Sequence, residues 1–154
     1  MTPQPFTLRP VGEADFEPLL DLSIRVLRAD LERVGRFDPD RRRARMRAGF
    51  DPATLSAIEV EGRLVGCIAA AAHPDHLEVH SFYLEPALQG RGLGAAVFAA
   101  VADAHRGLPV RIEVLKGSPV HRFWEKQGFA RTGAQAFDWL YERPARLGAA
   151  LPAA

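Results

Sequence analysis

Residues 84–98 read LEPALQGRGLGAAVF, and this stretch places three glycines within five positions, at Gly90, Gly92 and Gly94. Glycine loses more backbone entropy on folding than any other residue, so this density indicates a backbone that approaches a partner closely or turns sharply. The preceding residues 76–84 have strand character, and a helical pattern follows at once. At a helix N-terminus several N–H groups lack intrahelical acceptors, and the helix dipole adds positive charge. The stretch therefore predicts an anion site, with phosphate as the usual ligand.

The spacing of the glycines separates this loop from two common phosphate-binding loops. A P-loop requires G-x-x-x-x-G-K-[ST], and no lysine is present here. A dinucleotide-binding loop requires G-x-G-x-x-G and a second βαβ half, whereas the spacing here is G-x-G-x-G. The pattern that fits is Q-x-x-G-x-G, formed by Gln89, Gly92 and Gly94. The alternative is that the glycines only form a tight turn between strand and helix.

The composition is that of an ordinary soluble domain. The sequence has 154 residues, of which 47% are hydrophobic and 25% charged, enough for one domain with a substantial core. The formal net charge of +1 argues against nucleic acid or an acidic membrane surface as a partner. The single cysteine, Cys67, excludes an internal disulfide and suits a reducing compartment. Neither a membrane span nor a signal-peptide pattern is present, so we expect a cytoplasmic protein.

Helix caps and turn residues predict the remaining helices and strands. Asp15 and Asp38 are predicted N-caps, the second with Pro39 inside the helix and Gly49 at its end. The dipeptide at 61–62 predicts a hairpin turn. The expected strands are 6–11, two within 55–72, 76–84, 109–116, 129–131 and 136–142, and the expected helices begin at about 15, 38, 92 and 118.

This order of elements predicts an α+β fold. Residues 77–115 form a βαβ unit, which implies a parallel pair of strands, and the other pairings are expected to be antiparallel. We expect a mixed, mostly antiparallel central sheet of about six or seven strands with about four flanking helices. Residues 1–143 are expected to form a single domain, and residues 144–154 a flexible tail.

The glycine stretch and VRIEVLKGSPVHRFWEKQGF (110–129) together resemble the two main motifs of the GCN5-related N-acetyltransferases, the GNAT superfamily. The resemblance covers nearly the whole chain and includes the order of the elements. It implies that backbone amides of the loop hold the pyrophosphate of coenzyme A. The loop residues to which it assigns this role are Gln89, Gly90, Arg91, Gly92, Leu93, Gly94 and Ala95.

The same resemblance implies roles for the strand that precedes the loop. Backbone N–H groups of Phe82, Tyr83 and Leu84 would polarise the thioester carbonyl of acetyl-CoA. If no bulge intervenes, residues 78, 80, 82 and 84 share one face of this strand. Glu78 and His80 are therefore the two candidates for the base that deprotonates an acceptor ammonium, and the choice between them stays open.

The second motif departs from the family at one position. A tyrosine that protonates the leaving thiolate commonly lies four residues before the Gly of Gly-Phe, and this chain has Trp124 there. An indole N–H is a donor only and cannot act as the acid. The acid is then Tyr83, Tyr141, Ser118 or a water, or none is required. Ser118, Phe123 and Trp124 are expected to line the coenzyme site.

Other chemical interpretations of the chain are weaker. HPDHLEVH (73–80) suggests a metal site, but His76 and His80 would lie about 13 Å apart along a strand, so no metal is expected. The arginines of DRRRARMR (40–47) are expected on a solvated helix face, or else one or two of them select an acceptor bearing a carboxylate or phosphate.

We therefore expect an enzyme that transfers acetyl from acetyl-CoA to a primary amine of a small molecule or peptide, by direct attack in a ternary complex. A homodimer is compatible with the resemblance. One alternative is a non-catalytic sensor or regulatory domain that binds acyl-CoA. The other is an interaction domain whose glycine loop is only a turn.

Overall fold

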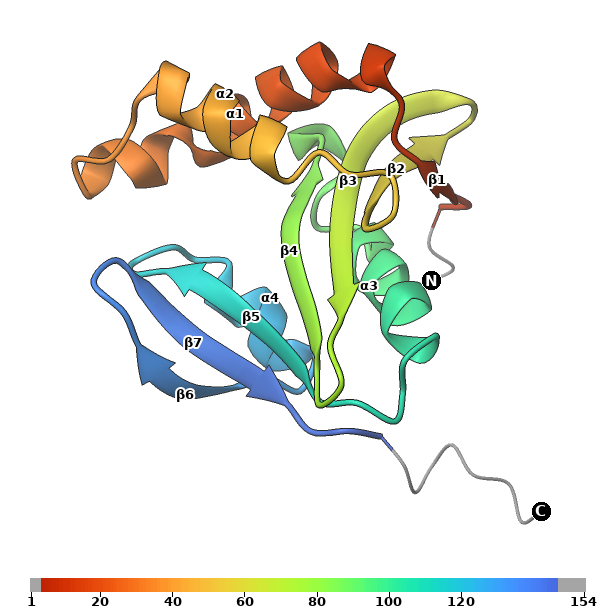
Figure 1. The fold of residues 1–154 in the computed structure, drawn as a ribbon, viewed down its shortest axis with the longest axis vertical. Coiled ribbons are helices and arrows are strands. Elements are labelled where there is room, and N and C mark those ends of the chain that lie inside the picture. The colour runs from red at the N-terminus through yellow and green to blue at the C-terminus, as the bar shows by residue number, and fades with distance from the viewer. Residues whose placement is uncertain (1–3, 147–154) are drawn as a thin grey trace. The chain divides into compact units, whose positions relative to one another are not determined.

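The computed structural model describes residues 4–146, so most of the predicted tail, residues 147–154, lies outside the described residues. Seven strands form one sheet in the order β1-β2-β3-β4-β5-β7-β6, as predicted for an α+β fold of this type (Figure 1). Within the described residues, no helix is both long and apolar enough for a membrane span. The elements are β1 (Thr7–Pro10), η1 (Glu13–Asp15), α1 (Phe16–Arg33), α2 (Pro39–Ala48), β2 (Leu55–Val60), β3 (Arg63–Ala72), β4 (Leu77–Leu84), η2 (Pro86–Leu88), α3 (Leu93–Asp103), β5 (Val110–Leu115), α4 (His121–Lys126), β6 (Ala130–Ala134) and β7 (Asp138–Arg143).

The described chain divides into two compact units, and three elements pass from one unit to the other. The first unit contains residues 4–69 and 81–96, and the second contains residues 70–80 and 97–146. β3, β4 and α3 therefore each contribute residues to both units.

In the first unit, α1 and α2 pack together beside the antiparallel strands β1, β2 and β3 (Figure 1). The buried residues of α1 are Phe16, Leu19, Leu20, Leu22 and Ser23, which lie in its first two turns. Asp38 accepts hydrogen bonds from the N–H groups of Asp40 and Arg41, so its predicted role as N-cap of α2 is confirmed. The core of this unit is formed by Val11, Phe16, Leu19, Leu20, Leu22, Met46, Leu55, Ala57, Cys67 and Ala69.

The predicted cap of α1 is wrong, because a 3₁₀ turn precedes the helix. The Asp15 side chain makes no cap hydrogen bond to α1. Its carboxylate instead accepts the Gly12 N–H at 2.8 Å and pairs with the Arg9 guanidinium at 2.8 Å. The hydrogen bonds from Arg9 hold the pKa of Asp15 below its usual value.

The predicted hairpin is confirmed by its backbone. Glu61 and Gly62 have φ of +53° and +74°, the left-handed conformation that a two-residue turn between twisted strands requires. The turn joins β2 to β3.

In the second unit, β5, β7 and β6 form an antiparallel group, and α4 lies over one face of it (Figure 1). The first two residues of β4, Leu77 and Glu78, pair in parallel with Val110 and Arg111 of β5. The predicted parallel pair is therefore confirmed. The core of this unit includes Tyr141 and the aromatic residues Phe98, Trp124 and Phe129, and the half-buried Phe123 contacts the Trp124 ring.

Candidate functional site

The glycine loop owes its shape to two left-handed residues. Gly90 and Gly92 have φ of +76° and +83°, which side chains with a Cβ rarely adopt. A Cβ built on either glycine meets no heavy atom within 4 Å. These glycines are therefore required for backbone conformation and not for close contact with the protein, and the space beside them is open to a ligand.

The N-terminus of α3 continues this open face. The Ala96 N–H donates to the Gly92 carbonyl at 3.1 Å and makes the first turn of the helix. The N–H groups of Leu93, Gly94 and Ala95 precede this bond, so they have no acceptor within the helix. The Leu93 side chain is 2% exposed and belongs to the core, so this residue has only its backbone to offer a ligand.

Gln89 holds the loop in place. Its side-chain amide donates to the Leu84 carbonyl, the last residue of β4, at 3.0 Å. The turn η2 between them is preceded by Glu85, whose carboxylate pairs with Arg25 of α1 at 3.0 Å. The hydrogen bond from Gln89 thus positions the loop at the end of the strand, a role that the sequence motif alone did not reveal.

The strand before the loop is irregular at Ser81. Leu77 and Val79 are buried and Glu78 and His80 exposed, as in a regular strand, but Ser81 has φ of +48° and Leu84 is buried. The condition of a regular strand therefore fails at Ser81, and residues 82 and 84 do not continue the exposed face of Glu78 and His80. A left-handed residue in a strand turns the residues that follow it, here Phe82 to Leu84.

Gly66 on β3 accommodates this irregular segment. A Cβ at Gly66 would lie 2.2 Å from the Tyr83 carbonyl oxygen, so only glycine allows the two strands to approach in this way. The Cys67 thiol donates to the Ser81 carbonyl at 3.2 Å. Burial raises the pKa of this thiol to about 12, which excludes a thiolate nucleophile near neutral pH.

Arg42 lies beside the same segment within the first unit. Its guanidinium is 3.5 Å from the Ser23 hydroxyl, and its buried Nε has no hydrogen-bond partner. The positive charge of Arg42 acts on Tyr83, although burial is the larger effect and raises the pKa of the Tyr83 hydroxyl. The neighbouring arginines Arg43 and Arg47 pair instead with exposed glutamates near the start of α1. Arg42 is therefore distinguished from Arg43 and Arg47 by its buried, unpaired donor.

The two candidate bases lie together in the second unit. The Glu78 carboxylate and the His80 imidazole are 4.0 Å apart, and their side chains are 50% and 41% exposed. Both groups are accessible to solvent. The structure does not choose between them.

His73 also lies near Glu78, which the sequence did not predict. The His73 N–H donates to the His76 carbonyl at 2.8 Å, and this turn brings ligand atoms of His73, His76 and Glu78 within 4.8 Å of one another. Asp75 contacts the His76 ring at 2.7 Å. The spacing argument considered only His76 and His80 and missed His73. Two nitrogen or oxygen atoms bound to one tetrahedral zinc ion lie about 3.4 Å apart, so these side chains would have to move closer together to bind one.

The predicted site residues Ser118 and Trp124, before and within α4, make contacts inside the protein. The buried Ser118 hydroxyl accepts the Val120 N–H at 3.2 Å. Trp124 is 7% exposed, and its ring lies 5.3 Å from both Phe98 and Phe129. Phe123 is half-buried. Coenzyme contacts by Ser118, Phe123 and Trp124 stay predictions.

A hydrogen-bonded group that sequence reasoning missed lies beside this helix. The buried Tyr141 hydroxyl donates to the Glu125 carboxylate at 3.3 Å, and the His121 ring lies 3.3 Å from the same oxygen. The spacing of His121 and Glu125 on one helix face was visible in the sequence. Their contact with Tyr141 depends on the packing of β7.

Comparison with known proteins identifies the family. The model of the acetyltransferase (GNAT) family matches residues 22–129. Mycothiol acetyltransferase of Thermomonospora curvata is 38% identical over 101 residues, which are 62% of this chain and 33% of that protein. The chain thus matches about a third of the length of that relative.

Solved structures show the same fold at low sequence identity. PaiA N-acetyltransferase from Thermoplasma acidophilum, determined in complex with coenzyme A, has a TM-score of 0.72 at 15% identity, over 92% of this chain and 99% of that one. A structure from Corynebacterium glutamicum, described as histone acetyltransferase HPA2 and related acetyltransferase, has a TM-score of 0.68 at 17% identity, over 100% of both chains. Together with the family match, these comparisons show that the chain belongs to the acetyltransferase (GNAT) family of acyltransferases.

Proposed function

We propose that this protein transfers the acetyl group of acetyl-CoA to a primary amine of a small molecule or peptide, by direct attack in a ternary complex. The observation that carries the proposal is the open backbone of the glycine loop at the N-terminus of α3, in a chain of this family. A cytoplasmic location and a homodimer belong to the same proposal.

In this proposal the loop binds the pyrophosphate of acetyl-CoA. The N–H groups from Gly90 to Ala95 and the positive end of α3 supply the binding energy, and no lysine is needed. Each hydrogen bond to a charged oxygen contributes about 1.5–3 kcal/mol. The exposed Arg91 side chain adds a positive charge.

The chemical step uses the irregular part of β4. The amine nitrogen attacks the thioester carbon, backbone N–H groups among Phe82 to Leu84 stabilise the oxyanion, and the carbon–sulfur bond breaks. The proton of the acceptor ammonium passes to Glu78 or His80. The coenzyme thiol has a pKa near 8.5, so it can leave largely as the thiolate without an acid from the protein.

Arg42 favours an acceptor that carries a carboxylate near its amine. Unlike Arg43 and Arg47, it forms no ion pair among the described residues, so the charge of its half-buried guanidinium can act on a carboxylate of the acceptor. A carboxylate matches the planar arrangement of guanidinium donors better than a hydroxyl does. An amine screen should therefore include amino acids and dipeptides beside polyamines.

The binding half of the proposal is tested by calorimetric titration with acetyl-CoA, with pantetheine as the ligand that lacks phosphate. We expect micromolar binding of acetyl-CoA and much weaker binding of pantetheine. Gly92→Ala should weaken acetyl-CoA binding at least about tenfold, through loop distortion and loss of aligned N–H groups.

Gly35→Ala is the matched control, since Gly35 also has a positive φ, +72°, and open space around it. Gly35→Ala should lower the free energy of unfolding about as much as Gly92→Ala does, and it should leave the affinity for acetyl-CoA unchanged. Equal affinity of both variants for acetyl-CoA would show that the glycine loop does not contribute to coenzyme binding. Failure of the unaltered protein to bind acetyl-CoA would overturn the proposed function.

A second candidate function is a sensor that binds acyl-CoA without turnover. The observation that favours it is the burial of Trp124 at the position where the resemblance implies a catalytic tyrosine. Tight binding of acetyl-CoA with no product across the amine screen would support the sensor and exclude the transferase.

A further inference from the structure

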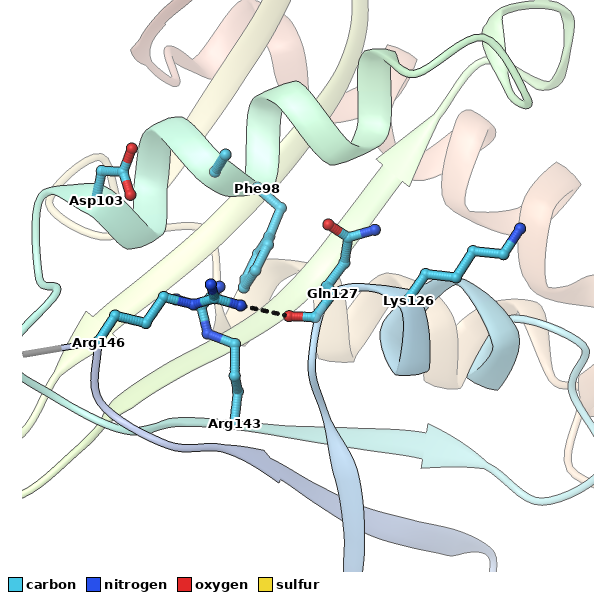
Figure 2. Close-up of a pocket in the computed structure, with 7 residues that line it drawn as sticks. Phe98, Asp103, Lys126, Gln127, Arg143 and Arg146 are labelled. Carbon is cyan, nitrogen blue, oxygen red and sulfur yellow. Dashed lines mark hydrogen bonds between the residues drawn. The ribbon is translucent and has the colours of Figure 1, made fainter. Parts of the chain in front are cut away.

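A charged pocket in the second unit has no place in the proposed reaction. It has a volume of about 210 Å³ and is lined by Phe98, Ala99, Asp103, Lys126, Gln127, Arg143 and Arg146. Figure 2 shows the guanidinium groups of Arg143 and Arg146 close to one another beside the ring of Phe98. The pocket lies at the C-terminal ends of α3, α4 and β7, whereas the glycine loop precedes the N-terminus of α3.

Arg143 is the central observation, because its side chain is buried without sufficient partners. The residue is 7% exposed, and its Nε donor has no hydrogen-bond partner. A buried unpaired donor on a charged group costs free energy, so most proteins satisfy such groups. The ring of Phe98 lies 5.1 Å from the guanidinium carbon and faces it, but a ring does not replace an acceptor in the plane of the donors.

Arg146 increases the positive charge at the same place. Its guanidinium donates to the Gln127 carbonyl at 3.3 Å (Figure 2). Burial and the charge of Arg146 lower the pKa of Arg143, and Asp103 opposes them only in part. Lys126 and Asp103 also belong to the lining, but in Figure 2 the Lys126 ammonium group points away from the two guanidinium groups.

The backbone is adapted to these two arginines at Gly128. This residue has φ of +96°, and a Cβ there would lie 3.0 Å from an Arg146 nitrogen and 3.4 Å from the Arg143 side chain. Both arginines are thus packed against a position where glycine leaves room for them. The arrangement holds two guanidinium groups close together on one pocket.

We propose that this pocket binds a small phosphate-type dianion, either inorganic phosphate or a phosphate monoester, between Arg143 and Arg146. A guanidinium group donates pairs of parallel hydrogen bonds to phosphate oxygens, and the guanidinium groups of Arg143 and Arg146 both line this pocket. The volume is below the about 300–1,000 Å³ of pockets for drug-sized ligands and suits a small anion. The inference is independent of the acetyl-transfer proposal.

The test is calorimetric titration of the full chain with inorganic phosphate, glycerol phosphate and acetate, each with and without saturating coenzyme A. We expect both phosphates to bind, acetate to bind at least about tenfold more weakly, and coenzyme A to leave phosphate binding unchanged. Tighter binding of glycerol phosphate would identify a monoester as the source, and tighter binding of inorganic phosphate would identify the free ion.

Arg143→Met removes the buried donor with little change in volume, and it should weaken phosphate binding at least about tenfold. Arg143→Lys keeps the charge but loses the paired donors, so it should show an intermediate loss. The control is Arg122→Met, which removes the same charge from an exposed position on α4 outside the pocket. Thermal unfolding without phosphate verifies that each variant folds.

Three outcomes would overturn the proposal of a phosphate site in this pocket. The first is equal phosphate affinity of Arg143→Met and the unaltered protein, and the second is a loss of phosphate affinity in Arg122→Met as large as in Arg143→Met. The third is displacement of phosphate by coenzyme A. The last outcome would show that phosphate occupies the coenzyme site.

Discussion

At the scale of single residues, the chemistry of this protein depends on a few side chains whose surroundings differ from those of their neighbours. Glu78 and His80, the two candidates for the base in the proposed reaction, are exposed and 4.0 Å apart. Arg42 and Arg143 each bury a donor without a partner, whereas Arg43 and Arg47 are paired with glutamates.

Substitution of Glu78 separates the two candidate bases. Glu78→Gln should lower kcat about 10²–10⁴-fold if Glu78 is the base, because a general base typically contributes that factor, and it should leave acetyl-CoA affinity unchanged. The measurement is steady-state acetylation of the best amine from the screen, with Glu113→Gln, another exposed glutamate of the same unit, as the control. A full rate in Glu78→Gln combined with loss in His80→Ala would assign the base to His80.

At the scale of elements, the irregular end of β4 and its neighbour β3 determine which backbone N–H groups of Phe82 to Leu84 are available for the proposed oxyanion site. Gly66 permits the approach of β3 to the Tyr83 carbonyl, and the left-handed Ser81 turns the residues after it. The glycine loop begins directly after this segment and is fastened to it by Gln89. Local alternation of apolar residues identified the strand but did not locate the irregularity.

Replacement of Gly66 tests the importance of this approach. Gly66→Ala places a Cβ 2.2 Å from a backbone oxygen, so it should lower the free energy of unfolding by about 1–3 kcal/mol and reduce acetyl transfer in the protein that remains folded. The measurements are urea unfolding and kcat. Gly133→Ala is the control, since its Cβ would meet only the flexible Leu140 side chain, at 3.4 Å. Equal stability of both variants would show that β3 and β4 can separate at no cost.

At the scale of the whole molecule, the proposed reaction uses backbone N–H groups and one side-chain base, with no metal. Overnight treatment with EDTA followed by gel filtration should therefore leave acetyl transfer unchanged, as measured by release of free coenzyme thiol. Loss of activity that zinc restores would contradict this prediction and would implicate His73, His76 and Glu78, whose ligand atoms lie within 4.8 Å of one another. His73→Ala, which leaves both candidate bases in place, would then abolish the restoration.

The sequence by itself determined the order of the elements, the hairpin at Glu61 and Gly62, the cap at Asp38 and the glycine loop before α3, because these depend on neighbours along the chain. The order of strand, helix and strand in turn implied the parallel pair. Only the tertiary structure decided the turn of β4 at Ser81, the burial of Trp124, the approach of His73 to Glu78, and the unpaired donors of Arg42 and Arg143. The approach of His73 to Glu78 depends on the turn between His73 and His76, and the other features depend on residues far apart in sequence. A strand pattern reports which face is apolar, whereas packing determines which polar atoms find a partner.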